Sequence, residues 1–359
     1  MIQDQWGQHL IKGWNDDDWM GQPMRVGNAV GKLIGAAADT VTMGDTLSIK
    51  VFQALSSALQ MRPDRNVILS DTGNFPSDLY MAQGLIEHLG GQLELRLVEP
   101  EAIVESIDDT IAVVMLTHVD YRTARMHDLL AVTQAAHAAG AIMLWDLAHS
   151  AGAVPVDVVA ANCEFAVGCT YKYLNGGPGA PAFIYVRPDL VSQCSPVLSG
   201  WLGHEAPFAF EQSYRPAADI ERMRVGTPPV LQLMALESAM GVWDSVTIQD
   251  VRDASIKLSE LFIALVEQQC PQLTLASPRN SSLRGSHVSF SFQHGYAAMQ
   301  AVIERGVIGD FRAPDLMRFG FTPLFIDEHD IHQAVDLLAE VLDRQLWDDP
   351  KYRQSGRVT

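Results

Sequence analysis

The stretch GCTYKYLNGGPG, residues 168–179, places a single lysine, Lys172, just ahead of a glycine-rich turn. Upstream, the stretch AIMLWDLAHS, residues 141–150, contains an apolar run that ends in an acid, Asp146. Apolar runs that alternate with amphipathic segments are typical of strands in a parallel sheet covered on both faces. Ligands bind beyond the carboxyl ends of such strands, so the sequence predicts Lys172 and Asp146 in one site.

An amine nucleophile and a strand-end acid suit a cofactor with an aldehyde and a ring nitrogen, which is pyridoxal 5'-phosphate (PLP). Lys172 would hold the aldehyde as a Schiff base, and Asp146 would keep the pyridine nitrogen protonated. The turn Asp45–Ser48 precedes a predicted helix and could hold the phosphate with backbone N–H groups and hydroxyls. Each feature alone has an ordinary interpretation as a cap, a surface lysine or a tight turn, so the inference depends on their order and expected co-location.

Composition argues against several classes of binding partner and against a membrane-spanning protein. The 359 residues include 43 acids against 25 lysines and arginines, a net charge of −18, which argues against nucleic acid and anionic membranes as partners. The four cysteines form no C-x-x-C pair, so we expect no metal site and favour a reduced, cytoplasmic protein. The N-terminus lacks a secretory pattern, and the apolar runs are too short to span a bilayer.

The spacing of apolar residues predicts two α/β domains. Residues 1–245 form a large domain with a mainly parallel sheet, preceded by a first helix through Trp6 and Trp14. Its expected strands are 67–70, 93–98, 111–117, 141–146, 165–169 and 182–186, and its expected helices include 78–89 and 126–139. Residues 246–359 form a smaller α+β domain, with helices 256–269, 296–305 and 330–346 and strands 287–292 and 317–320.

Seven segments spread over the chain resemble the kynureninase family of PLP enzymes. They are NFPSDLY (74–80), LTHVDYRT (116–123), WDLAHSAGA (145–153), CTYKYLNGGPG (169–179), SGWLGH (199–204), GTPP (226–229) and MRFGFTPL (317–324). The resemblance implies the aspartate-aminotransferase fold (PLP fold type I), with a large domain of the seven-stranded type. It also implies hydrolysis of L-kynurenine, or 3-hydroxykynurenine, to an anthranilate and L-alanine in tryptophan catabolism.

The resemblance also assigns roles to individual residues. The implied cofactor contacts are Thr46, Leu47, Phe75, Pro76, Ser77, Asp78, Thr117, Asp146, His149, Tyr171, Lys172, Trp201 and Thr227. Lys172 is also the implied base for the substrate's Cα proton, and Tyr171 is a hypothesised proton donor or acceptor. Asp78 matches a second acid near the ring, and Phe75 the aromatic that stacks on it. Without the resemblance, Phe75 would be taken for a core residue.

Two further residues match substrate contacts. Arg318 matches the guanidinium that binds the α-carboxylate, and Trp14 matches a substrate-side aromatic. Taken alone, Arg318 would be a surface ion pair and Trp14 a core residue. The family is expected to form homodimers, in which Trp201 reaches the cofactor from a partner subunit.

The sequence departs from the family pattern in three places. An N-terminal Asp-Gly-Asn-Ser-Leu-Gly pattern of the family does not occur, and we expect this to affect substrate binding more than cofactor binding. Ser77 and Ala124 stand where threonine and glycine are common. The alternatives are a PLP-binding protein with little activity, or another lyase of this fold such as a cysteine desulfurase. The second would need a reactive thiol, for which Cys194 is the candidate.

Overall fold

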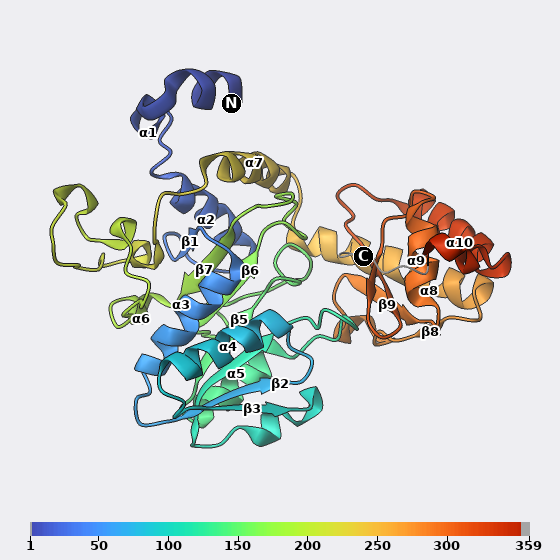
Figure 1. Ribbon diagram of the computed structural model, residues 1–359, viewed down its shortest axis with the longest axis horizontal. Helices are drawn as coiled ribbons and strands as arrows, with labels where there is room; N and C mark the ends of the chain where they lie inside the picture. Colours follow the sequence, from blue (N-terminus) through green and yellow to red (C-terminus); the bar gives the residue numbers. More distant parts are fainter. Residues whose placement is uncertain (1, 353–359) are drawn as a thin grey trace. The chain divides into compact units, whose positions relative to one another are not determined.

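The computed structural model describes residues 2–352, which form two compact units (Figure 1). The first unit comprises the chain up to His118 together with Asp128–Val246. The second comprises Val119–His127 and the chain from Thr247 onward. The short segment 119–127 lies within residues 1–245, the range predicted for the large domain, yet in the structure it belongs to the second unit.

The first unit is built on a seven-stranded sheet, counted over the described residues, in the order β1-β7-β6-β5-β4-β2-β3. Neighbouring strands from β3 to β6 are parallel, and β7 runs antiparallel to both β6 and β1. The strands are β1 (Val41–Met43), β2 (Val67–Asp71), β3 (Glu94–Val98), β4 (Ile111–Thr117), β5 (Ile142–Asp146), β6 (Phe165–Cys169) and β7 (Ala182–Val186). The predicted mainly parallel sheet is confirmed.

Helices cover both faces of this sheet. The helices of the first unit are α1 (Gly13–Asp16), α2 (Gln22–Leu33), α3 (Leu47–Gln60), α4 (Pro76–His88), α5 (Leu129–Ala138), α6 (Pro188–Val191) and α7 (Val230–Met240), of which α1 stands apart from the sheet (Figure 1). Residues of α3 share one core cluster with Ile142 and Leu144 of β5. On the opposite face, Trp145 donates to the hydroxyl of Thr133 on α5 at 3.0 Å. Side chains alternate along a strand, so Asp146 lies on the α3 face.

The second unit packs three helices against an antiparallel sheet. In the part of the chain described, the sheet order is β10-β11-β9-β8. The elements are α8 (Ile248–Gln269), β8 (Thr274–Leu275), β9 (His287–Ser291), α9 (Gly295–Ile303), β10 (Asp310–Arg312), β11 (Leu316–Gly320) and α10 (Glu328–Asp343). Phe262 on α8 contacts Phe290 and Phe319 on the sheet, with ring centroids 6.1 and 5.0 Å away. This core leaves the other sheet face for polar residues.

Backbone contacts explain why segment 119–127 belongs to the second unit. The Gly285 N–H donates to the Ala124 carbonyl at 2.8 Å, and the Met126 N–H donates to the Leu283 carbonyl at 2.9 Å. The Ser289 hydroxyl on β9 donates to the Arg122 carbonyl. Hydrophobic periodicity along one segment cannot reveal such long-range pairing.

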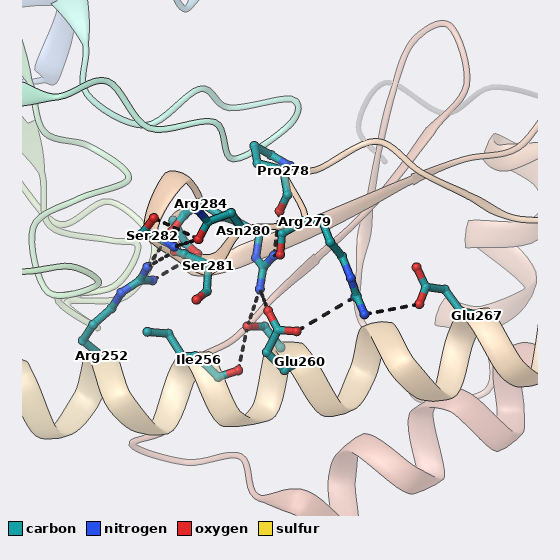
Figure 2. Close-up of polar contacts among 12 residues, drawn as sticks. Arg252, Ile256, Glu260, Glu267, Pro278, Arg279, Asn280, Ser281, Ser282 and Arg284 are labelled. Carbon is teal, nitrogen blue, oxygen red and sulfur yellow. Dashed lines mark hydrogen bonds and ion pairs between the residues drawn. The ribbon is translucent and has the colours of Figure 1, made fainter.

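Two buried arginines hold the β8–β9 loop that receives this segment (Figure 2). Arg284 donates to the Pro278 carbonyl at 2.7 Å and to the Glu260 carboxylate at 2.6 Å. Arg252 donates to the carbonyls of Ser281 and Arg284 at 2.6 and 2.7 Å. The two buried guanidinium groups thus supply donors to the backbone carbonyls of this loop.

The N-terminus differs from its predicted single helix. It forms a π-helical turn (Ile2–His9), a 3-10 turn (Leu10–Lys12) and the short α1. The predicted stripe fails because Trp6 and Leu10 are exposed rather than packed. Within residues 2–352, no helix combines the length and apolar character needed to cross a bilayer.

Candidate cofactor and substrate site

The carboxyl edge of the large sheet collects several of the predicted cofactor residues. Thr117 ends β4 and is the register partner of Asp146, which ends β5. His149 lies in the turn after β5, and all three residues are buried. Lys172 follows the end of β6, the next strand in the sheet. Parallel strands thus place a hydroxyl, an acid, an imidazole and an amine along one edge.

Two aromatic rings flank the Lys172 amine. Its Nζ lies 6.0 Å from the ring centroid of Phe75 and 5.8 Å from that of Tyr171. Phe75 immediately precedes α4, whose first residue is Pro76. Phe75 is 38% exposed, so it is not the core residue that composition alone would favour. The start of α4 and the loop after β6 therefore meet at Lys172.

Two buried acids complete the surroundings of Lys172. Burial raises the pKa of Asp146 to about 6, opposed by the Lys172 ammonium and by the Ala148 N–H, which donates to the carboxylate at 2.8 Å. Burial raises the pKa of Asp78 well above 3.8, and the Asp146 charge raises it further while Lys172 lowers it. Two carboxylates facing one ammonium leave an excess negative charge in a low-dielectric place.

That excess charge fits PLP. A protonated pyridine nitrogen would balance the second carboxylate and supply a hydrogen-bond donor. The Oδ2 atom of Asp78 is buried and has no hydrogen-bond partner among residues 2–352, so a ligand donor would satisfy it. The charge and the orphaned acceptor therefore match the ring end of the cofactor.

The start of α3 fits the phosphate end. Thr46 is the N-cap residue of this 14-residue helix, and its side chain makes no capping hydrogen bond. The first N–H groups of a helix, here from Leu47 onward, have no partner within the helix and bind anions well. Ser48 in the first turn shares a 2.8 Å hydrogen bond with Ser77 near the start of α4. Sequence analysis did not single out Ser48 by itself, although its place in a Thr-Leu-Ser helix start was a usable signal.

A pocket lies beside this turn. It is a small pocket lined by Met43–Asp45 and Arg224–Pro229, which include Thr227. The buried Lys50 donates to Asp45 at 3.2 Å and to the Met223 carbonyl at 2.9 Å, so it ties the two walls together. Thr227 thus lies close to the predicted phosphate turn.

Tyr171 combines an exposed ring with a partly buried phenol. The residue is 46% exposed, and its hydroxyl lies beside Cys169. Burial of the phenol, followed by the proximity of Cys169, raises the pKa of Tyr171. A phenol that keeps its proton is suited to donate it.

The structure places the two predicted tryptophans in different surroundings. Trp201 is 43% exposed and contacts Phe208 edge to face at 5.7 Å, while the next residue, Leu202, donates to the Val225 carbonyl. Trp201 therefore lies near the Thr227 segment of its own chain. Trp14 contacts Trp19 edge to face at 5.6 Å. The roles of both tryptophans remain predictions.

Arg318 lies on β11 of the second unit. Its Nε donates to Asp310 at 2.8 Å, its Nη2 donates to the same carboxylate, and its Nη1 donates to the Tyr121 carbonyl at 2.5 Å. The side chain is 12% exposed, so it is not an ordinary surface ion pair. Asp310 was missed by sequence analysis because β10 spans three residues, too few to show periodicity.

The fold and this set of residues define a PLP-dependent enzyme of fold type I. Solved structures with the same fold include the cysteine desulfurase of Thermococcus onnurineus NA1, at 18% identity and a TM-score of 0.78 over 91% of this chain and 85% of that one. A lysine-to-alanine mutant of the cystine C–S lyase C-DES, with glycine covalently linked to its PLP cofactor, has 17% identity and a TM-score of 0.82 over 94% of this chain and 91% of that one.

Sequence comparison identifies the family. A profile described as the kynureninase C-terminal domain matches residues 251–338. Kynureninase from Pseudomonas fluorescens is 47% identical over 366 residues, covering 100% of this chain and 88% of that protein. Kynureninase from Burkholderia mallei (strain SAVP1) is 46% identical over 99% of this chain and 87% of that protein. The chain belongs to the kynureninase family, and its cofactor is PLP.

The cysteine desulfurase alternative is not favoured. Cys194 is 2% exposed, and its thiol donates to the Leu190 carbonyl. Burial raises the pKa of Cys194 to about 12, so the reactive thiolate is not formed near neutral pH.

Proposed function

We propose that this protein hydrolyses L-kynurenine, its 3-hydroxy form, or both, to the corresponding anthranilate and L-alanine in tryptophan catabolism. The observation that carries the proposal is the Lys172 amine between two aromatic rings and beside two buried acids, in a chain of the kynureninase family. PLP, when bound, supplies the electron sink that lets a Cβ–Cγ bond break.

The surrounding side chains have separate tasks in this proposal. Lys172 would hold the cofactor and would serve as the base that moves the proton at the substrate's Cα. Asp146 holds a proton on the pyridine nitrogen, and Asp78 adds negative charge close by. Phe75 supports the ring face, and the phenol of Tyr171 transfers a proton at the hydrated ketone or at Cβ.

The remaining predicted contacts concern the phosphate and the substrate. Thr46, Leu47, Ser77 and Thr227 bind the phosphate from the start of α3 and its neighbours. Arg318 binds the substrate's α-carboxylate, and Trp14 contacts the aromatic part of the substrate. The functional form is a cytoplasmic homodimer, in which Trp201 serves the partner's cofactor; its exposed ring supports this.

A single assay tests the proposal. The protein is mixed with PLP and L-kynurenine, and anthranilate fluorescence is followed, with L-cysteine as the competing substrate. Anthranilate from the wild-type protein, absent with Lys172→Ala, supports the proposal. Sulfide release from cysteine would instead indicate a desulfurase. A bound-cofactor spectrum without either product would indicate a PLP-binding protein of little activity.

A further inference from the structure

Three charged side chains share one face of the β10–β11 hairpin. Asp310 is the register partner of Arg318, and Arg312 lies two residues further along β10. Met317 and Phe319, which alternate with Arg318, belong to the hydrophobic core of the second unit. Strand alternation therefore puts Asp310, Arg312 and Arg318 together on the face opposite the core.

Arg318 is held in one orientation by two acceptors. A guanidinium has five N–H donors. Asp310 takes the Nε–H and one N–H of Nη2, and the Tyr121 carbonyl takes one N–H of Nη1. Within residues 2–352, two donors remain, one on each Nη nitrogen. A carboxylate has two oxygens, so this remaining pair suits bidentate binding of one carboxylate.

The carbonyl partner of Arg318 lies in a well-anchored turn. Asp120 accepts the Arg122 N–H at 2.9 Å and the Thr123 N–H at 2.5 Å, which closes the turn around Tyr121. The Arg122 carbonyl accepts from Ser289, the residue opposite Arg318 on β9. The acceptor that orients Nη1 is therefore fixed by the sheet that carries Arg318.

Arg312 gives the cluster a surplus positive charge. Its Nη2 lies 3.3 Å from Asp310, so one carboxylate faces two guanidinium groups. The Nε atom of Arg312 is buried without a hydrogen-bond partner in residues 2–352. Burial, followed by repulsion from Arg318, lowers the pKa of Arg312, as expected where two cations share one anion. A third, anionic group would relieve this imbalance.

We propose that Asp310 is a positioning residue for substrate carboxylate recognition. It fixes the fork of Arg318 so that one N–H on each Nη nitrogen faces the α-carboxylate of an amino-acid substrate, and Arg312 keeps the cluster net positive. The inference rests on the proposed function, because Arg318 is taken there as the carboxylate contact. The inference adds two residues to the proposed substrate site: Asp310, which acts through Arg318, and Arg312, which acts beside it.

Asp310→Asn tests this role, because it keeps the side-chain size and removes the charge. We expect KM for L-kynurenine to rise about ten- to a hundredfold, with a smaller change in kcat, because one charge-assisted hydrogen-bonded pair is lost. Arg312→Gln should raise KM by a smaller factor. The matched control is Asp315→Asn in the same hairpin, whose carboxylate accepts from Ser291 rather than from Arg318. It should leave KM unchanged.

A double-mutant cycle separates positioning from general stability. In an Arg318→Ala background, Asp310→Asn should have almost no further effect on KM, because the group through which it acts is gone. An equal KM increase in both backgrounds would overturn the proposal, as would an unchanged KM in the single variant. If Asp310→Asn does not fold, Asp310→Glu keeps the charge with a longer arm, and an unchanged KM for it would refute strict positioning.

Failure of the proposed function has a separate signature. If the wild-type protein forms no anthranilate, the proposed reaction is wrong. The role of Asp310 in carboxylate recognition is then tested by the binding of L-alanine and of L-alaninamide, each followed through the absorption of bound PLP. Asp310→Asn should weaken L-alanine binding and leave L-alaninamide binding unchanged. Equal weakening of both ligands, or of neither, would refute the inference.

Discussion

Asp146→Asn should have opposite effects on the protein without and with its cofactor. Burial raises the pKa of Asp146 from 3.8 to about 6, so the ionised carboxylate is disfavoured in the folded apoprotein. At about 1.36 kcal/mol per pH unit, the ionised form costs about 3 kcal/mol of folding free energy. The amide carries no charge and can still accept from the Ala148 N–H, so it avoids this cost.

The sign of the pH dependence follows from which state of the protein, folded or unfolded, binds the Asp146 proton more tightly. The folded-state pKa of Asp146 lies above the unfolded value, so the contribution of this residue to the stability of the wild-type apoprotein is fully present below about pH 3.8. This contribution is lost as the pH rises to about 6, and above that pH no more is lost. The Asn variant lacks this loss. About half of the difference should be present at pH 5 and nearly all of it at pH 7. Asp78, whose pKa is also raised, is relieved in the same direction.

Thermal unfolding of the apoprotein measures this difference. About 3 kcal/mol corresponds to a rise of roughly 6–12 °C in the melting temperature of a unit of this size at pH 8. The control is Asp64→Asn, an exposed position after α3, which should change little. With the cofactor present, the amide cannot stabilise a protonated pyridine nitrogen, so PLP should bind the variant more weakly. The reasoning fails if the Asn apoprotein is less stable than wild type at pH 8, or if the difference is the same at pH 5 and pH 8.

Three other changes test the site and the second unit. Lys172→Ala should abolish turnover and the visible absorption of the covalently held cofactor; a retained band would contradict the assignment. Tyr171→Phe should lower kcat about a hundredfold or more while the cofactor spectrum remains, and unchanged turnover would exclude a proton-transfer role. Arg284→Ala should destabilise the protein by about 1–3 kcal/mol in urea unfolding, because it removes a fully buried guanidinium that donates to the Pro278 carbonyl and to Glu260. Arg279→Ala, at a 56% exposed side chain with ion pairs of 3.6 and 3.9 Å, should change stability by less than about 1 kcal/mol, and equal losses would contradict the distinction.

The buried strands could be predicted from the sequence because their signal is local. Residues 111–117 are six apolar residues followed by Thr117, and the structure forms β4 over the same residues. The predicted strands 165–169 and 182–186 also match β6 and β7. The glycine-rich turn after Lys172 and the strand-end acid Asp146 also predicted one site around Lys172, because parallel strands bring their carboxyl ends together.

Elements without a clear apolar period were harder to predict. The helix expected at residue 256 begins at Ile248, because its charged first two turns hide the stripe; the Thr247–Asp250 capping box was the available signal. α7 was not predicted because its own apolar residues lie on most sides of the helix, so that no apolar stripe stands out. The partnership of Asp310 with Arg318 depends on a hairpin register that no local pattern specifies.

The nine residues Val119–His127 make the two units inseparable by a single cut in the gene. A fragment that starts at Thr247 would lack the peptide that accepts from Gly285 and Ser289, so these groups would lose their acceptors within the protein. During synthesis, this peptide leaves the ribosome more than a hundred residues before Gly285 and Ser289, so its hydrogen bonds to them form only after those residues have been made. Isolating the second unit would therefore require a permuted chain, with this peptide joined to one of its ends.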